Sequence, residues 1–161
     1  MGHGASLMVL LLALVLAPAK PQEREHWVPS KTGTEDIQVV VFHHAFGSFD
    51  LNREVYFLDV EGKDPSPDLL VRFKSNRPPV KPRSAAKRIR RLRVIEEIRD
   101  KKSGVLGVIF FVGKIRPKSI DELEIEAGYD CGSLCMGVYT YTVNRTKAGW
   151  VVARATLRIQ S

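Results

Sequence analysis

The chain has 161 residues, with 25 lysines and arginines against 18 aspartates and glutamates, so its formal net charge is +7. The length excludes two domains of ordinary size, because the roughly 140 residues that follow an export-type leader are enough for only one hydrophobic core. The charge is uneven, since residues 71–102 hold thirteen bases and three acids and alone make the chain basic. We therefore predict one domain over residues 34–161, with a cationic middle segment.

Residues 1–19 have the pattern of a cleavable signal peptide. An uncharged run from Leu7 to Ala17 precedes Ala17-Pro18-Ala19, the small-x-small form that a signal peptidase needs. The run is about eleven residues and a stable membrane helix needs roughly twenty, which disfavours a permanent anchor. The first six residues also fit a myristoylation pattern, but that signal normally precedes a cytosolic domain. We expect cleavage after Ala19 and export to the periplasm or the extracellular space.

Two helices are predicted in the first half of the domain. Residues 20–33 are polar and proline-bearing and are expected to be a flexible lead-in. Thr34 has the features of a helix cap, and the apolar spacing that follows predicts a helix over residues 35–46, with His44 on its apolar stripe. After a strand at residues 54–60, Ser66-Pro67-Asp68 predicts the start of a second, short helix.

Lys87–Arg99 fits either a helix or a strand. Isoleucines and a leucine recur at helical spacing, but Leu92, Val94 and the turn at residues 100–104 fit the first arm of a hairpin. We favour the hairpin, whose return arm would be the valine- and phenylalanine-rich strand at residues 105–115.

The last forty residues predict an antiparallel meander. Leu123, Ile125 and Ala127 alternate with glutamates, and two further strands follow at residues 138–143 and 150–159 across glycine-containing turns. Early helices and late strands predict an α+β fold, with two short helices packed on a curved antiparallel sheet that ends in a three-stranded meander. The shape that we favour is a cystatin-like or nuclear-transport-factor-like roll.

Five short motifs stand out along the chain. They are Asp64-Pro65-Ser66-Pro67-Asp68-Leu69-Leu70, Val80-Lys81-Pro82-Arg83-Ser84, Gly128-Tyr129-Asp130-Cys131-Gly132-Ser133-Leu134-Cys135, Gly149-Trp150-Val151-Val152 and Ile159-Gln160-Ser161. Together they resemble a group of small exported bacterial proteins with no established function, and the Tyr-x-Cys-Gly-x-x-Cys turn with the later Gly-Trp is the most distinctive part. The resemblance implies export and a single domain, and it implies no catalytic residues.

Cys131 and Cys135 are the only cysteines, and three residues separate them at a predicted turn between strands. In an oxidising compartment this spacing favours a disulfide that closes the tip of a hairpin. Two unpaired buried thiols are the first alternative and a reactive thiol is the second. A redox-active pair of cysteines is instead typically found as Cys-x-x-Cys at the start of a helix.

The cationic segment is the candidate for binding an anion. Its side chains at Lys87, Arg88, Arg90, Arg91 and Arg93 could hold an anionic polymer or a membrane surface. The alternative is that alternating arginines only solvate an exposed strand. Nucleic acid is the least favoured ligand, because the segment lacks interleaved aromatic residues that would stack bases.

The sequence offers little for catalysis. His44 on an apolar stripe is better explained as a hydrogen-bonded packing residue than as a general base, and His43 as solvated. No Gly-x-Ser-x-Gly, phosphate loop or His-Glu-x-x-His is present, no metal site is expected because the cysteines lack two further ligands, and no cofactor is predicted. A small apolar ligand held by Trp150, Tyr139 and Tyr141 is a further candidate.

Three functions therefore stand as hypotheses. The first is a non-enzymatic exported binding module with a basic surface. The second is a small enzyme with a site in the concave face of the sheet, where His44 or the Cys131 thiol would act. The third is a structural envelope protein or subunit.

Overall fold

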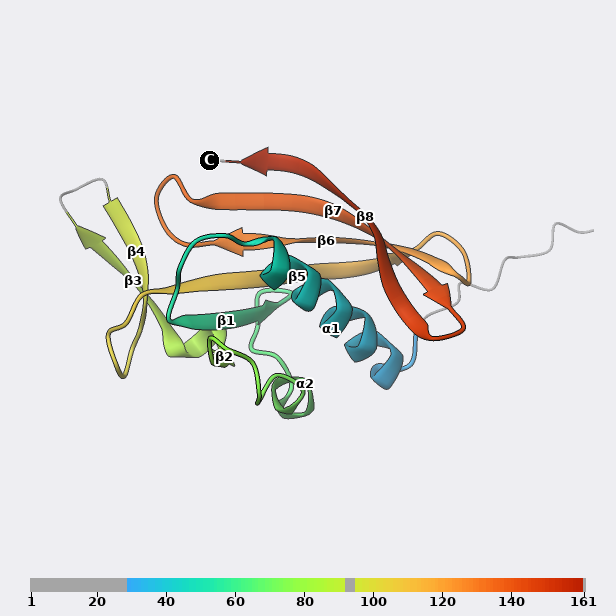
Figure 1. The fold of residues 1–161 in the computed structure, drawn as a ribbon, viewed down its shortest axis with the longest axis horizontal. Coiled ribbons are helices and arrows are strands. Elements are labelled where there is room, and N and C mark those ends of the chain that lie inside the picture. The colour runs from blue at the N-terminus through green and yellow to red at the C-terminus, as the bar shows by residue number, and fades with distance from the viewer. Residues whose placement is uncertain (1–28, 92–94, 161) are drawn as a thin grey trace, which may run out of the picture.

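The computed structural model describes residues 29–91 and 95–160 (Figure 1). The predicted signal peptide, most of the predicted lead-in and Arg93 lie outside these residues. The elements are α1 (Lys31–Ser48), β1 (Val55–Val60), α2 (Pro67–Val71), β2 (Val80–Pro82), a 3-10 turn (Arg83–Ala85), β3 (Ala86–Arg91), β4 (Ile95–Asp100), β5 (Gly107–Pro117), β6 (Glu122–Asp130), β7 (Met136–Thr146) and β8 (Gly149–Gln160).

Six strands form one sheet in the order β2-β1-β5-β6-β7-β8, and β3 pairs with β4 in a separate two-stranded ribbon. The α+β class and the meander β6-β7-β8 are confirmed. The expectation of a purely antiparallel sheet is wrong, because β1 runs parallel to both β2 and β5. The physical reason lies in β1, whose first five residues are all buried, as is typical of a parallel strand covered on both faces.

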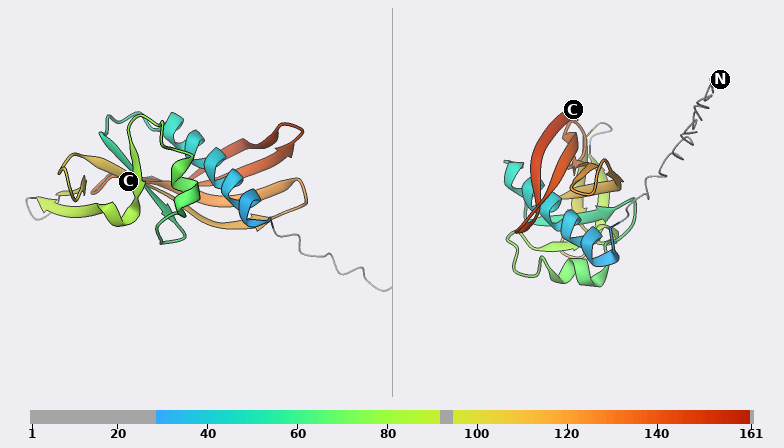
Figure 2. Two further views of the ribbon diagram at one scale, coloured as in Figure 1. Left: turned by 90° about the horizontal axis from the view of Figure 1, so that it is seen from below. Right: turned by 90° about the vertical axis from the view of Figure 1, so that its right-hand side faces the viewer.

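Helix α1 packs diagonally across one face of the sheet (Figures 1 and 2). It buries Ile37, Val41 and Phe42, which join a core that includes Phe110 from β5 and Tyr141 from β7. Burial of these large apolar side chains supplies most of the stabilisation in a domain of this size. The face of the sheet that lies opposite α1 is therefore the face still available for a site.

Helix α1 begins earlier than the sequence predicted. Ser30 caps it, because the Ser30 hydroxyl accepts a hydrogen bond from the Gly33 amide at 3.2 Å. Thr34 lies inside the first turn, where its amide donates to the Ser30 carbonyl at 2.8 Å. The predicted lead-in therefore ends before residue 31. The predicted cap of α2 is confirmed, since the Ser66 hydroxyl accepts from the Leu69 amide at 3.0 Å.

The prediction that Lys87–Arg99 pairs with the strand at residues 105–115 is wrong. The segment is extended, as we favoured, but it contains two strands, β3 and β4, that pair with each other. Opposite charges face each other across this ribbon, such as Arg90 opposite Glu96, and such cross-strand pairs stabilise an antiparallel ladder. Strand β5 instead pairs with β1 and β6, where its apolar residues are buried.

The ribbon covers only one part of the face opposite α1. Ile98 of β4 packs there in a second small core with Val55, Phe57 and Ile109. The ribbon lies at one end of the sheet, and the tips of the β5–β6 and β7–β8 hairpins lie at the other end (Figures 1 and 2). The polar part of this face, over β5 to β8, is left open.

Candidate anion-binding site

The predicted anion-binding residues of β3 do not share one face. Side chains alternate along a strand, so Arg88 and Arg90 lie on the side toward the sheet, whereas Lys87 and Arg91 lie on the outer side. The run of cations in the sequence is therefore split between two surfaces of the ribbon.

Carboxylates already neutralise the β3 arginines. Arg88 forms ion pairs with Asp130 and, at 3.6 Å, with Glu96, which also pairs with Arg90 at 3.2 Å. Arg91 pairs with Glu97 at 3.4 Å. Exposed pairs of this kind add little stability, but each one cancels charge locally. An anionic ligand would have to displace these carboxylates.

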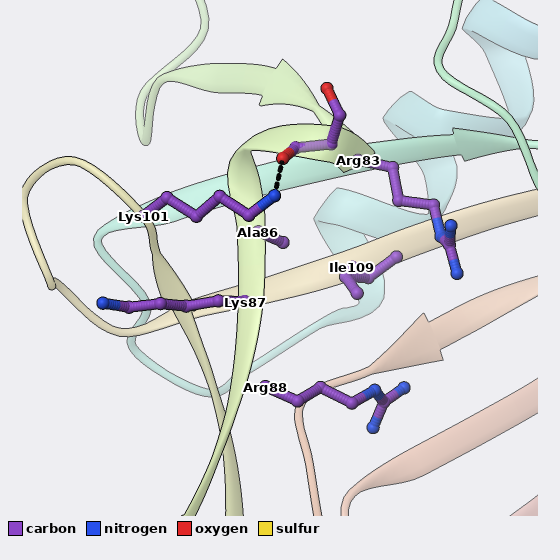
Figure 3. A pocket seen from close by; sticks show the side chains of 7 residues that line it. Arg83, Ala86, Lys87, Arg88, Lys101 and Ile109 are labelled. Carbon is purple, nitrogen blue, oxygen red and sulfur yellow. Dashed lines mark hydrogen bonds between the residues drawn. The ribbon is translucent and has the colours of Figure 1, made fainter.

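A shallow depression of 270 Å³ beside the ribbon gathers four cations, and Figure 3 shows its lining. The lining residues are Arg83, Ser84, Ala86, Lys87, Arg88, Lys101 and Ile109. Arg83 is paired with Asp59 of β1 at 2.7 Å, and the Lys101 ammonium donates to the Ser84 carbonyl at 2.7 Å. In Figure 3 the side chains of Lys87 and Arg88 extend in opposite directions. Arg83 and Arg88 therefore fasten the ribbon to the sheet rather than converge on a ligand.

A second depression, of 320 Å³, lies on the open polar part of the sheet face opposite α1. We call this surface the arginine–threonine face and define it by Arg116, Thr140, Thr142, Arg154, Thr156 and Arg158, with Glu124 also lining the depression. The strand register places these side chains together. In the ladder Arg116 lies opposite Glu124, Glu124 lies opposite Thr142, and Thr142 lies opposite Arg154, across four neighbouring strands.

The three arginines of this face have no ion-pair partner among residues 29–91 and 95–160, in contrast to those of β3. Glu124, the acid beside them, pairs with Lys118 at 2.9 Å. Glu122 and Glu126 lie exposed on the same face, and Lys114 offsets part of their charge. The surface therefore keeps a net positive charge together with three threonine hydroxyls that can donate hydrogen bonds.

The spacing of the arginines suits a ligand with several negative groups. Arg116 and Arg154 lie three strand positions apart, so their backbones are about 14 Å apart at the usual spacing between strands. Arg154 and Arg158 lie four residues apart along β8, which corresponds to about 13 Å. The geometry fits an extended anion better than one small oxyanion.

The sequence pattern predicted the strand that carries Arg154 and Arg158 but not the face that they form with Arg116. The local signal is the alternation Arg154-x-Thr156-x-Arg158, which places three polar side chains on one side of an extended strand. Arg116 is separated from them by almost forty residues, so only the strand register brings it to the same surface.

The two cysteines form a disulfide at the turn between β6 and β7, with their Cα atoms 5.3 Å apart. The Cys131 amide also donates to the Cys135 carbonyl at 2.9 Å. A thiol nucleophile therefore does not exist in this state of the protein, so the proposed role of Cys131 in an enzyme would require prior reduction.

The prediction that His44 belongs to the apolar stripe of α1 is wrong, although its Nδ1 lies 3.5 Å from the Ser48 hydroxyl, as expected for a hydrogen-bonded packing residue. His44 is exposed, because the buried stripe runs through Ile37, Val41, Phe42 and Ala45 instead. Its ring lies edge-on to Tyr141, with ring centroids 5.4 Å apart, and burial raises the pKa of Tyr141 to about 12. His43 is also exposed, and its ring lies 5.0 Å from that of Phe73. Within the described residues, neither histidine is hydrogen-bonded to a carboxylate or thiol.

The aromatic residues that were expected to hold a small apolar ligand are not gathered in one pocket. Trp150 lines a groove of 360 Å³ between α1 and the β7–β8 tip, with the Asp36–Arg72 ion pair on its wall. Tyr141 is buried in the core, and Tyr139 is half-buried away from this groove.

In the described part of the chain, no three His, Cys, Asp or Glu side chains come together in a way that could hold a metal ion. Neither helix within the same residues is long and apolar enough to cross a membrane. Comparison of the chain with protein-family models, with curated proteins and with solved structures finds no match.

Proposed function

We propose that the protein is an exported, non-enzymatic module that binds an extended anionic partner through the arginine–threonine face. The observation that carries the proposal is the set of three arginines on one open surface, none of which forms an ion pair with the described part of the chain. A guanidinium matches carboxylate, sulfate and phosphate groups with two parallel hydrogen bonds. Binding at this face would not have to break an existing ion pair, whereas binding at β3 would.

Export and group membership are parts of the same proposal. The pattern of residues 1–19 and the Cys131–Cys135 disulfide both suit an oxidising compartment outside the cytosol. Membership of the group of small exported bacterial proteins rests on the motifs quoted above. The cystatin-like or nuclear-transport-factor-like shape is supported by the packing of α1 across one face of the sheet.

The test compares two triple variants on heparin, which serves as the anionic probe. The first variant removes the arginines of the arginine–threonine face by Arg116→Gln, Arg154→Gln and Arg158→Gln. Three exposed ion pairs at about 0.5 kcal/mol each correspond to about tenfold weaker binding. The dissociation constant is measured by calorimetry, and the salt concentration needed for elution from heparin–agarose should fall in parallel.

The matched control changes the net charge by the same amount at β3, by Arg88→Gln, Arg90→Gln and Arg91→Gln. Because those arginines are already paired with carboxylates, we expect this control to weaken heparin binding much less. Equal losses in both variants would mean that net charge alone governs binding. A larger loss in the β3 control would place the site on the ribbon and contradict the proposal.

A further inference from the structure

The two edges of the six-stranded sheet differ in a way that points to a binding partner. One edge is β2, which has three residues and ends in Pro82, and proline on a short strand is a common way to block edge pairing. The other edge is β8, which has twelve residues and no proline. In Figures 1 and 2 no described helix or strand lies along the outer side of β8.

The side chains of β8 alternate between charge and apolar surface. Arg154, Thr156 and Arg158 lie on the arginine–threonine face. Leu157 lies opposite Tyr139, points to the other face and is 48 % exposed. Ile159, beyond the irregularity at Arg158, lies opposite Val138 and is therefore on the same side as the arginine–threonine face. The edge therefore offers a neighbouring strand its backbone groups, a basic row on one face and the exposed apolar side chain of Leu157 on the other face.

The regular part of this edge is short. Strand β8 departs from regular pairing with β7 at Ala153 and at Arg158, and bulges of this kind increase the local twist. Regular pairing continues over Arg154–Leu157 between them. A partner would therefore contribute a strand of about five residues, with negative side chains four residues apart to meet Arg154 and Arg158.

We infer that β8 accepts a short peptide strand in which acidic and apolar residues occupy opposite faces. This inference rests on the proposed function and names its partner as a polypeptide. Backbone N–H and C=O groups on a free edge are satisfied by the ladder of another strand, as in other cases of strand addition. A polysaccharide could meet the arginines, but it has no peptide backbone to complete that ladder.

A second copy of this chain fits the edge less well. In a two-fold antiparallel pairing centred on Thr156, Arg154 of each copy would lie opposite Arg158 of the other. Like charges directly opposite each other destabilise a sheet. Any two-fold register would also gather four arginines on one face of the joined sheet. An acidic strand removes this repulsion.

The experiment uses the acetylated, amidated peptide Thr-Glu-Val-Thr-Val-Glu-Thr and two derivatives that carry the same charge. One derivative has N-methyl groups on both valines, and the other has N-methyl groups on both glutamates and the central threonine. Alternate N–H groups of a strand point to opposite sides, so only one derivative blocks the ladder. We expect one of the two derivatives, the one whose N-methyl groups face β8, to bind at least about tenfold more weakly than the parent peptide. The derivative whose N-methyl groups face away from β8 should bind like the parent peptide.

The outcomes separate the inference from the proposed function. Equal binding of all three peptides, with loss in Arg154→Gln/Arg158→Gln, would mean that charge alone holds the peptide, and strand addition would be wrong while the proposed function stands. Binding of heparin but of no peptide would also overturn strand addition alone. If neither heparin nor a peptide binds, the proposed function itself is wrong. Sedimentation that shows a dimer, dissociated by the peptide, would assign the edge to a second copy.

Discussion

Asp100 is the carboxylate that ties three parts of the chain together at the end of β4. Its side chain is 1 % exposed and accepts hydrogen bonds from the Ser103 hydroxyl at 2.7 Å, the Ser103 amide at 2.9 Å and the Lys81 ammonium of β2 at 2.9 Å. The hydrogen bond from the Ser103 hydroxyl lowers the pKa of Asp100 most, and the other two bonds lower it further. Together they exceed the opposing effect of burial and bring this pKa to about 2. The turn after β4 therefore depends on a negative charge.

The sign of the pH dependence follows from that lowered pKa. An unfolded aspartate has a pKa of about 3.9, so ionised Asp100 stabilises the fold fully above about pH 4. This contribution is lost as the pH falls from about 4 toward 2. Asp100→Asn should lower the free energy of unfolding by on the order of 2 kcal/mol at pH 7, and the difference from the unmodified protein should shrink toward pH 2.

Urea denaturation at pH 7, 4 and 2 measures this effect. Asp121→Asn is the matched control, because Asp121 is exposed and is in no ion pair with the described residues. A difference between Asp100→Asn and the unmodified protein that stays constant from pH 7 to pH 2 would contradict the role of the ionised carboxylate.

Arginines in this chain lie in two different settings that look alike in the sequence. Arg88 meets Asp130, which is 42 positions away, whereas Arg154 lies opposite Thr142 in the strand ladder. Local sequence showed that both segments are basic and extended. The partner that neutralises an arginine depends on tertiary contacts. The sequence could therefore predict a candidate anion site on the segment with the most cations, but not which arginines lack an ion-pair partner among the described residues.

At the level of elements, the disulfide turn does more than close a hairpin. Its Ser133 hydroxyl accepts from the Glu96 amide at 2.8 Å, and its Ser133 amide donates to the Glu96 carbonyl at 3.1 Å. Gly132 has a φ of 111°, and a Cβ there would collide with the Glu96 carbonyl. The turn therefore docks the β3–β4 ribbon on the sheet, which leaves the arginine–threonine face open at the other end.

The intact mass of the secreted protein tests both the disulfide and the export proposal. We expect a chain that begins at Lys20 and takes up no alkylating reagent until it is reduced, after which Cys131 and Cys135 should each take up one. The reason is that a bonded sulfur is not a nucleophile. A mass that includes residues 1–19 would contradict cleavage after Ala19, and alkylation before reduction would contradict the disulfide in the secreted protein.

At the level of the whole molecule, the sequence predicted the elements better than their arrangement. Apolar spacing, the Ser66 cap and the alternation in the last forty residues are local signals, and they correctly gave both helices and the meander. The parallel pairing of β1 with β5 joins residues about fifty positions apart, such as Phe57 and Ile109. Burial of β1 on both faces favours this parallel pairing. The local sequence of residues 105–115 shows a buried strand but does not show which strand lies beside it.

Local sequence patterns also could not predict the candidate anion-binding surface. The composition showed a basic chain, and the net charge of +7 is compatible with binding at several surfaces. Ion pairs hold Arg88, Arg90 and Arg91 of the most basic segment, so an anion that bound there would have to displace carboxylates. The strand register across β5 to β8 then creates the arginine–threonine face from residues that are scattered in the sequence.

NMR of the arginine side chains tests directly whether the arginine–threonine face is the binding surface. Nε–Hε signals of the protein labelled with ¹⁵N-arginine are assigned by single substitutions and titrated with a heparin hexasaccharide. We predict that the signals of Arg116, Arg154 and Arg158 shift together with one dissociation constant, while those of Arg88 and Arg90 stay within the change caused by salt alone. Shifts confined to Arg88 and Arg90 would contradict the assignment of the arginine–threonine face as the binding surface.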